Sequence, residues 1–315
     1  MKNWVKKYRK TAFTLIELLV VIAIIGILSG LIVVSMSGVT QKANIAKAQV
    51  FSNSLKNSLM LNLISEWKLD EVIITTNPYS TPDSWSGGNI GNLYGSAGSQ
   101  NLPQKQTSGC VSGNCFSFDG TDDYIDLGMN LTFPSLDSVG NSFSFSFWVY
   151  DNSSTSKRVF TKGKHHDGVS HDPQIIMDVG TSPSLIFRDS VSSSPYTFNT
   201  ALNVLQWYNV TLSITRTSSD NTNVKIYVNG SLDRSADGVY RDYDVNLPLE
   251  LGRYTSYTMS SVYFKGSIDD VRIYNAAIST SQIKEQYYAG LNNLLTNGGI
   301  NKEEYLSKIN NIAKE

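Results

Sequence analysis

The first strong pattern along the chain is an apolar run over Leu15–Val34. A helix of about 20 apolar residues is long enough to cross a lipid bilayer. The segment before it, Met1–Ala12, carries five basic residues and no acidic one. Because such flanks hold a helix end in the cytoplasm, the chain beyond Val34 is expected outside it. A cleaved secretory signal fits less well, since the run is long and no small-x-small site closes it.

Beyond Val34, apolar residues recur every three or four positions, as they do along one face of a helix. The members of this stripe are Ala43, Ala46, Val50, Leu55, Leu59, Leu63 and Ile64. No proline interrupts residues 13–65. The pattern therefore predicts one continuous helix over 13–65, roughly 80 Å long at 1.5 Å per residue.

From Trp67 onward the pattern changes to short alternating segments separated by Gly, Asn and Ser. In the clearest, Phe143–Tyr150, the apolar residues Phe143, Phe145, Phe147 and Val149 face one way, and Ser144, Ser146 and Trp148 face the other. Further strands are predicted at Arg158–Thr161, Gln174–Val179, Leu185–Arg188, Trp207–Thr215, Val224–Val228 and Phe264–Tyr274. Asn229-Gly230 predicts a tight hairpin turn. We expect an α+β fold, a long N-terminal helix followed by an antiparallel β-sandwich.

Composition adds little to this picture but excludes one class of partner. The 315 residues carry a net charge of -1, so charge balance does not indicate a nucleic acid partner. Charged residues make up 17%, below the roughly 25% of ordinary soluble domains. A polar but weakly charged, strand-rich chain suits an extracellular location.

Glu17 lies inside the apolar run, where an unpaired carboxylate costs several kcal/mol. Cleavage between Ala12 and Phe13 would place a new α-amino group four residues from it, about one helical turn. The segment Thr11–Gly26, TAFTLIELLVVIAIIG, resembles the leader and helix motif of type IV pilins and pseudopilins. The resemblance implies that a prepilin peptidase cuts before Phe13 and methylates it, and that Glu17 neutralises the amino terminus of a neighbouring subunit. The family usually has Gly before the cut, so Ala12 predicts slower processing.

A second resemblance covers most of the remaining chain. It rests on WKLDE, CFSFDGTDDYIDLG, FSFSFWVY, WYNVTLSITRT, VKIYVNGSLD and FKGSIDDVRIYNAAIS, which follow one another in this order. These segments resemble laminin-G-like domains with the concanavalin-A-like jelly roll. The resemblance implies a first strand at Trp67–Glu71 and ligands on a concave face or at rim loops. We therefore expect a leader at 1–12, a transmembrane and assembly helix at 13–65, a head at 66–290 and a helical tail at 291–315.

Two local features follow from the residues themselves. Cys110 and Cys115 are the only cysteines, and no second Cys/His pair accompanies them at metal-ligand spacing. An extracellular compartment favours a short-loop disulfide between them. In the tail, Ser279 and Gln282 have capping-box spacing, and Asn301 precedes a predicted helix over Lys302–Ala313. Whether these helices pack on the sandwich or extend from it is left open.

Acidic residues fall in strands that the fold would bring together: Asp70, Glu71, Asp119, Asp122, Asp123, Asp269 and Asp270. Carboxylates in such a cluster suit Ca²⁺, although solvated turn carboxylates would look the same. The resemblance implies a structural Ca²⁺ on the convex side, held by an acid at the position of Asp269 and by groups of the first strand. We expect Asp269 to be the first ligand, followed by Asp70 and Asp119. His165, His166 and His171 share one segment, which is either a transition-metal site or an exposed loop. No organic cofactor is expected.

Catalysis is disfavoured, because glucanases that share this jelly roll use an E-x-D-x-x-E or E-x-D-x-E strand motif, which the chain lacks. Binding is favoured by the tyrosines before the last strand, which are either ligand contacts or structural residues. They are Tyr240, Tyr243, Tyr254, Tyr257 and Tyr263.

The expected function is a filament subunit, first in the cytoplasmic membrane and then on the cell surface, that displays a head for glycan or protein ligands. A minor pilin or type II secretion pseudopilin is the alternative. A membrane-anchored carbohydrate-active enzyme is the least favoured.

Overall fold

The chain divides into two compact units, Met1–Ser54 and Leu55–Glu315. The computed structural model describes residues 15–26, 54, 57–75, 78–85, 88–95, 102–128, 136, 138–153, 157–163, 174–179, 184–188, 193–239, 248–254 and 262–313. In the first unit, residues 15–26 are helical and exposed. No helix within the described ranges is both long and apolar enough to span a membrane. Residues 13, 14, 27–53, 55 and 56 of the predicted helix lie outside those ranges.

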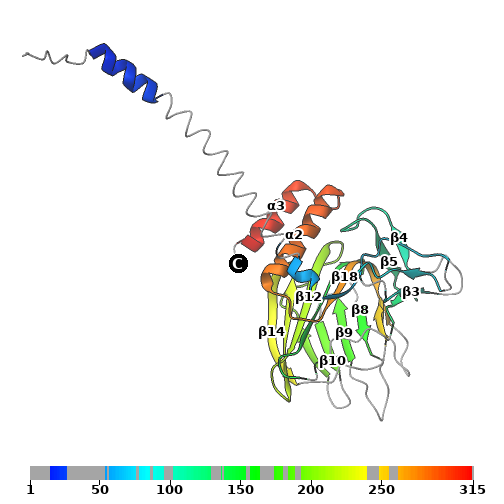
Figure 1. Ribbon diagram of the computed structural model, residues 1–315. Helices are drawn as coiled ribbons and strands as arrows, with labels where there is room; N and C mark the ends of the chain where they lie inside the picture. The colour runs from blue at the N-terminus through cyan, green and yellow to red at the C-terminus, as the bar shows by residue number, and fades with distance from the viewer. Residues whose placement is uncertain are drawn as a thin grey trace, which may run out of the picture. The chain divides into compact units, whose positions relative to one another are not determined.

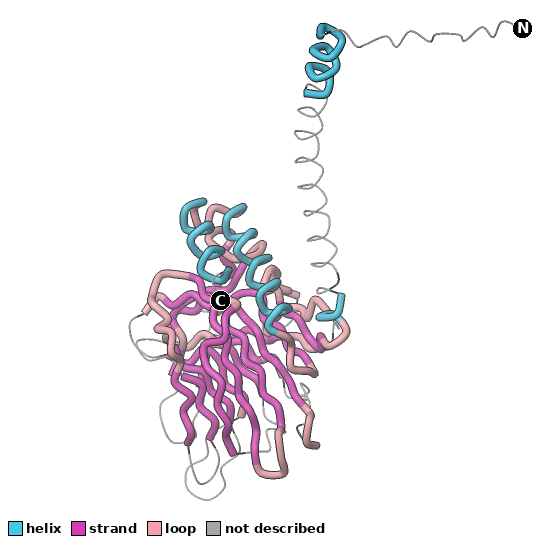
Figure 2. The backbone as a smooth tube through the Cα atoms, turned by 90° about the vertical axis from the view of Figure 1, so that its left-hand side faces the viewer, coloured by secondary structure: helices cyan, strands magenta, loops and turns pink. Residues whose placement is uncertain are grey.

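The second unit contains two antiparallel sheets (Figures 1 and 2). Within the described residues, the first sheet has the order β14-β13-β12-β7-β18-β5-β4, and β1 also pairs with β18. Its strands are β1 (Leu63–Trp67), β4 (Gln104–Gln106), β5 (Cys115–Asp119), β7 (Ser142–Asp151), β12 (Trp207–Arg216), β13 (Asn221–Val228), β14 (Ser231–Val239) and β18 (Lys265–Tyr274).

The second sheet has the order β11-β10-β9-β8-β15-β6-β3-β2 across the described strands. They are β2 (Ser80–Thr81), β3 (Gly91–Tyr94), β6 (Tyr124–Asp126), β8 (Lys157–Lys162), β9 (Gln174–Val179), β10 (Ser184–Arg188), β11 (Ser193–Thr197) and β15 (Leu249–Leu251). A short hairpin of β16 (Arg253–Tyr254) and β17 (Val262–Tyr263) follows β15. The sandwich expected from the alternating segments is therefore confirmed.

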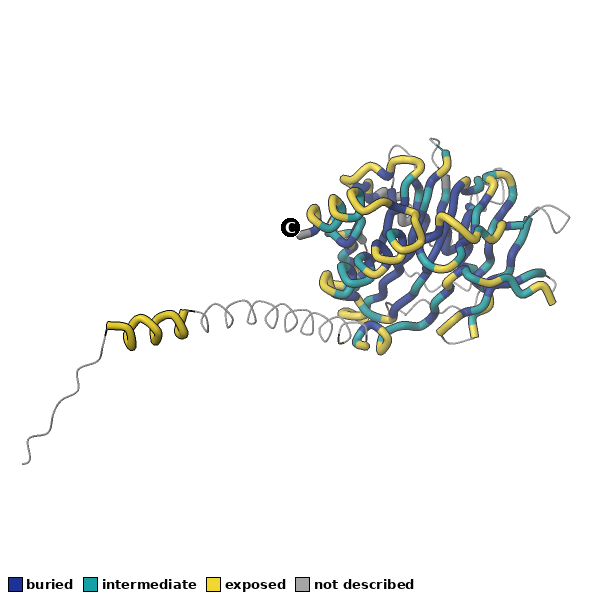
Figure 3. Tube along the Cα trace, turned by 90° about the horizontal axis from the view of Figure 1, so that it is seen from above, coloured by how far each residue is buried: buried dark blue, intermediate teal, exposed yellow. Residues whose placement is uncertain are grey.

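The core lies between the two sheets, where the strands are buried (Figure 3). As the alternation predicted, Phe143, Phe145, Phe147 and Val149 of β7 all point into it. Phe145 meets Phe160 of β8 edge to face, with ring centroids 4.7 Å apart. Apolar burial of this kind contributes roughly 1.5–3 kcal/mol per large side chain, so the interface between the sheets is the main source of stability.

Two helices cover the other face of the first sheet, α2 (Thr280–Thr296) and α3 (Lys302–Ala313). Trp148 of β7 stacks on Tyr287 of α2, with ring centroids 5.5 Å apart. Ser144 Oγ donates to the Ala276 carbonyl at 2.9 Å. The alternation predicted which side chains of β7 leave the core, and the structure adds that α2 and the turn before it cover them. The two helices lie side by side (Figure 1).

The predicted helix over 13–65 is wrong at its carboxyl end. Residues 57–60 are helical, but β1 begins at Leu63. Ser65 pairs with Ile273 and Trp67 with Val271 of β18. Pairing with a central strand and burial of Trp67 in the core outweigh the helical spacing of Leu59 and Leu63. The first strand was expected at Trp67–Glu71, but β1 covers Leu63–Trp67 and ends at Trp67.

The boundary between a head at 66–290 and a tail at 291–315 does not correspond to a structural division. Helix α2 runs across it, and both helices belong to the unit Leu55–Glu315. The predicted capping box of Ser279 and Gln282 is confirmed. Asn301 Oδ1 accepts a hydrogen bond from the Glu304 amide at 2.9 Å, so it caps α3 as expected. The helices pack on the sandwich because Leu291, Leu294 and other apolar residues meet Trp148 and Trp207.

Candidate functional site: acidic clusters and an aromatic face

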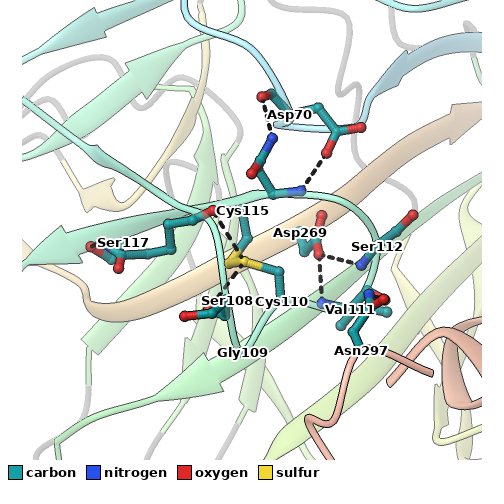
Figure 4. Close-up of a disulfide and its surroundings, with 12 residues drawn as sticks. Asp70, Ser108, Gly109, Cys110, Val111, Ser112, Cys115, Ser117, Asp269 and Asn297 are labelled. Carbon is teal, nitrogen blue, oxygen red and sulfur yellow. Dashed lines mark hydrogen bonds between the residues drawn. A yellow bond between two sulfur atoms is a disulfide. The ribbon is translucent and has the colours of Figure 1, made fainter. Parts of the chain in front are cut away.

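Cys110 and Cys115 form a disulfide, which confirms the pairing expected from the sequence (Figure 4). Their Cα atoms lie 5.5 Å apart and both side chains are buried. The bond closes a short loop directly before β5. The amides in this loop are the donors for two of the predicted site residues.

Asp269 of β18 is completely buried beneath the disulfide loop (Figure 4). Its Oδ2 accepts hydrogen bonds from the amides of Val111 at 2.9 Å and Ser112 at 3.0 Å. Its Oδ1 is buried without a hydrogen-bond partner in the described part of the chain. Burial raises the pKa of Asp269 well above the usual carboxyl range; the Asp270 charge adds to this effect, and the two amides oppose it. An orphaned carboxylate oxygen of this kind fits a bound cation.

Asp70 binds the same loop from the other side (Figure 4). Its Oδ1 accepts a hydrogen bond from the Asn114 amide at 2.6 Å, and its main-chain carbonyl accepts one from the Asn114 side chain at 2.9 Å. Gly113 has φ 57, and a Cβ there would lie 2.2 Å from Asp70 Oδ1. Glycine is therefore required for the loop to approach Asp70. Asp70 and Asp269, which are far apart in sequence, share one short loop.

A cavity of ≈ 330 Å³ opens beside Asp70. Its lining residues are Lys68, Leu69, Asp70, Glu71, Thr81, Pro82 and Ser84. Glu71, part of the predicted acidic group, is exposed at this cavity. Asp270 instead forms an ion pair with Arg272 at 3.2 Å, and Arg272 also binds Glu66 of β1 at 2.7 Å. Asp270 therefore belongs to a network that fastens the first strand to the last.

The structure does not bring Asp119 to Asp269. Asp119 pairs with Lys265, at the start of β18, whereas Asp269 lies four residues further along the strand. At about 3.3 Å per residue the two positions are roughly 13 Å apart along the sheet. The expected Ca²⁺ set of Asp269, Asp70 and Asp119 is wrong in its third member, because strand register separates it from the other two.

Asp119, the last residue of β5, instead lies close to Asp122 and Asp123 of the turn that follows. One carboxylate oxygen from each lies within 4.8 Å of the others, and among the described residues no other group of three acids, histidines or cysteines gathers so closely. The pKa of Asp123 is raised to about 6, chiefly by burial, with the charges of Asp119 and Asp122 adding to it. His165, His166 and His171 lie outside the described residues.

Of the predicted binding tyrosines, Tyr254 is buried and is not open to a ligand. It is 4% exposed, and the Arg158 guanidinium lies 5.0 Å from the centre of its ring. Arg158 is ion-paired with Asp178 on the neighbouring strand. Tyr254 is therefore a structural residue, one of the two readings open from the sequence. Tyr263 is partly exposed in β17, and Tyr240, Tyr243 and Tyr257 lie outside the described residues.

A second group of aromatic residues lies on the outer face of the second sheet. Tyr94 of β3 and Tyr124 of β6 are paired across the strands, and their rings stack with centroids 4.9 Å apart and an interplanar angle of 13°. The Arg253 guanidinium lies 3.3 Å from the Tyr124 ring centre. Glu250 holds Arg253 in an ion pair. We call Tyr94, Tyr124 and Arg253 the aromatic face.

The sequence interpretation missed this face, since its three residues are far apart in the chain. A local signal was present, because Asn92-Leu93-Tyr94 and Tyr124-Ile125-Asp126 each place one core residue between two outward ones. Burial raises the pKa of Tyr124, and the Arg253 charge opposes the rise. Both tyrosines remain partly exposed. The arrangement offers ring surface, hydroxyls and a cation to a ligand.

The comparisons assign this head to a family. Residues 119–284, more than half of the chain, match the concanavalin A-like lectin/glucanases superfamily. The chain belongs to this superfamily. Residues 7–33 match the prokaryotic N-terminal methylation motif, which confirms the resemblance to type IV pilins drawn from Thr11–Gly26. Phe13 and Ala12 lie outside the described residues, and Glu17 is exposed on the helix over 15–26.

Several solved structures are similar to this chain at low sequence identity. The binding domain of Paraclostridial Mosquitocidal Protein 1 is 14% identical, with a TM-score of 0.51 over 74% of this chain and 53% of that one. Domain 4 of AbnA, an extracellular GH43 arabinanase from Geobacillus stearothermophilus in complex with arabinotriose, is 19% identical. Its TM-score is 0.48, over 71% of this chain and 97% of that one. The receptor binding domain of botulinum neurotoxin type G is 16% identical, with a TM-score of 0.46 over 72% of this chain and 51% of that one. The chain thus spans about half the length of the mosquitocidal and neurotoxin domains. Among curated proteins, none matches it.

Proposed function

We propose that this protein is a type IV pilin-like filament subunit whose concanavalin A-like head binds glycans outside the cell. The observation that carries the proposal is the presence in one chain of a methylation motif at 7–33 and a lectin/glucanase-type domain at 119–284. In this proposal prepilin peptidase cuts after Ala12, and the mature subunit leaves the cytoplasmic membrane for a surface filament. Glu17 then pairs with the Phe13 amine of a neighbouring subunit.

The aromatic face is the proposed ligand site. Aromatic rings present apolar faces to sugar C–H groups, while tyrosine hydroxyls and arginine donate hydrogen bonds to sugar oxygens. Tyr94 and Tyr124 are held parallel, and the Glu250 ion pair fixes Arg253 beside them. Their geometry is therefore set before a ligand arrives, which lowers the entropic cost of binding. By contrast, α2 covers Trp148 on the first sheet.

A glycan array probed with the full chain in detergent micelles tests this proposal. We expect selective glycan binding, and Tyr94→Ala should lower the affinity by about tenfold or more, in line with loss of one aromatic contact. Tyr305→Ala is the matched control, since Tyr305 lies on α3, which packs against the first sheet. Absence of any glycan signal, or equal binding by the Tyr94→Ala protein, would contradict the proposed site.

A structural Ca²⁺ is proposed at Asp70 and Asp269. The support is the buried Asp269 Oδ1 without a partner and the disulfide loop that binds both carboxylates. A bound Ca²⁺ would neutralise a carboxylate that burial otherwise disfavours, and would fasten the loop before β5 to β18. The proposed role is stability of the head, not chemistry.

Two alternative functions are a minor pilin or pseudopilin and a membrane-anchored enzyme. A minor pilin or type II secretion pseudopilin would carry the same motif, and the abundance of this chain in sheared filaments separates that function from a bulk subunit. A membrane-anchored carbohydrate-active enzyme is less favoured, because the sequence lacks the paired-carboxylate strand motif of the related glucanases.

A further inference from the structure

Asp119 ends β5 of the first sheet, and the turn that follows, with Asp122 and Asp123, leads to β6 of the second sheet. One carboxylate oxygen from each residue lies within 4.8 Å of the other two. Ca²⁺ binds oxygen at about 2.3–2.6 Å, so two oxygens on one ion are at most about 5 Å apart. The three carboxylates are therefore already spaced as ligands of a single ion.

Burial gives a second and separate indication of a missing partner. Asp123 is 2% exposed, and its Oδ2 accepts a hydrogen bond from the Asp119 amide at 2.9 Å. Its Oδ1 is buried without a hydrogen-bond partner in the described structure, as is Oδ1 of Asp122. Asp119 is exposed and Asp122 is partly buried, but the two orphaned oxygens themselves are buried. Negative charge on buried oxygens without a partner costs free energy unless a cation is present.

No basic side chain within the described residues supplies that cation. None of the ion pairs in that part of the head includes Asp119, Asp122 or Asp123. Lys265 pairs with Asp119 in the sheet, but its stem packs on the turn at Gly120, where an added Cβ would lie 2.8 Å from the Lys265 Cβ. A bound cation would therefore be the partner that neutralises the negative charge of these three carboxylates.

We propose that Asp119, Asp122 and Asp123 bind a divalent cation of the Ca²⁺ type, at a site separate from Asp70 and Asp269. Oxygen ligands without histidine or cysteine select hard cations over Zn²⁺ or Cu²⁺. The ion fastens the turn between the two sheets. Asp123 directly precedes Tyr124, the central ring of the aromatic face, so the same ion also fixes the start of β6, where that ring is held.

Terbium luminescence tests the site, because Tb³⁺ replaces Ca²⁺ and a tyrosine close to the ion, here Tyr124, sensitises its emission. The full chain in detergent micelles should show tyrosine-sensitised Tb³⁺ emission that excess Ca²⁺ displaces. Asp122→Asn and Asp119→Asn should each weaken Ca²⁺ affinity by about tenfold or more, since each removes one charged ligand. Asp123 is left intact because it holds the Asp119 amide.

Three control variants make the result specific. Asp220→Asn removes one exposed charge elsewhere in the head and should leave emission and affinity unchanged. Asp269→Asn should also leave the sensitised emission near Tyr124 unchanged. Tyr124→Phe should abolish most sensitised emission while Ca²⁺ still binds by calorimetry. Sensitised emission that persists at full strength in both Asp119→Asn and Asp122→Asn, with folding verified by circular dichroism, overturns the proposal. Because this readout uses no glycan, failure of the glycan array leaves it intact.

Discussion

At the residue scale, the two oxygens of the Asp269 carboxylate have different surroundings. One accepts hydrogen bonds from two loop amides, and the other is buried without a partner in the described structure. Because the raised pKa of Asp269 reflects burial near other acids, its ionised form destabilises the fold unless a cation is bound. This balance makes the role of Ca²⁺ measurable through stability.

We predict that Ca²⁺ raises the melting temperature of the full chain and that EDTA lowers it. Calcium at one hundred times its dissociation constant would stabilise the folded state by about 2.7 kcal/mol. Asp269→Asn should lose the part of this response that comes from the Asp70 and Asp269 site, while any response from Asp119, Asp122 and Asp123 remains. It should melt no lower than wild type in EDTA, because the amide keeps an acceptor for the loop and removes the buried charge. Differential scanning calorimetry measures both effects. An unchanged wild-type melt in EDTA would be the contrary result.

Tyr274 makes the stability of the head depend on pH in the alkaline range. It is buried at the end of β18, its hydroxyl accepts a hydrogen bond from Gln286 of α2 at 2.8 Å, and burial raises its pKa to about 12. The unfolded chain releases this proton near pH 10, whereas the folded chain retains it until about pH 12. The contribution of Tyr274 to the free energy of unfolding is therefore fully present below pH 10 and is lost as the pH rises from 10 to 12.

We expect the free energy of unfolding to fall by about 3 kcal/mol between pH 10 and pH 12 from this residue, since each pKa unit is worth about 1.4 kcal/mol. Tyr274→Phe should be less stable at pH 8, having lost the hydrogen bond, but should show a shallower decline above pH 10. Urea unfolding at several pH values measures the slopes. Parallel slopes for the two proteins would show that Tyr274 is not responsible.

At the element scale, α2 is held on the first sheet by close contact between Gly290 and Trp148. A Cβ at position 290 would lie 2.2 Å from Trp148 Cζ2, which is inside van der Waals contact. The Trp148 side chain extends from β7, and its ring is stacked on Tyr287. The helix must therefore move away from the sheet to accommodate any side chain larger than hydrogen.

Gly290→Ala is predicted to destabilise the head by about 1–3 kcal/mol, the usual cost of overpacking, although alanine favours helix formation. Asn293→Ala, on the exposed side of the same helix, is the control and should be neutral or slightly stabilising. Thermal melts of both proteins, followed by Trp fluorescence, report on the contact directly. A Gly290→Ala protein as stable as wild type would mean that α2 is not pressed against Trp148.

The same element shows how much the sequence could predict. Alternation in β7 correctly separated Phe145 from Ser146, because successive side chains of a strand point to opposite faces. Alternation cannot identify what covers the second face. Ser146 Oγ donates to Gln286 Oε1 at 3.2 Å, a contact between residues separated by most of the head. The position of α2 depends on tertiary packing, and the two serines beneath it look solvent-exposed in the sequence.

At the scale of the whole molecule, the proposed assembly depends on Glu17. We predict that the Glu17→Ala precursor still inserts in the membrane and is still cleaved before Phe13. The variant chain should be absent from filaments, since the amine of the neighbouring subunit loses its partner. Sheared filaments analysed by mass spectrometry measure both the mature N-terminus and the incorporation. Glu17→Asp is the matched control and should assemble partially. Filaments with normal amounts of the Glu17→Ala chain would contradict this role, and a mature end other than Phe13 would contradict the processing.

The sequence by itself determined features that depend on neighbouring residues. The hairpin turn at Asn229-Gly230, with φ 52 and 83, and the capping box of Ser279 were predictable because turns and caps are decided within four residues. The tertiary structure alone decided which strands become neighbours. Strand order stacks Tyr94 on Tyr124, and register separates Asp119 from Asp269. Alternation assigns a side chain to a face, but pairing between distant strands decides what it meets there, and the binding sites proposed for this head depend on that pairing.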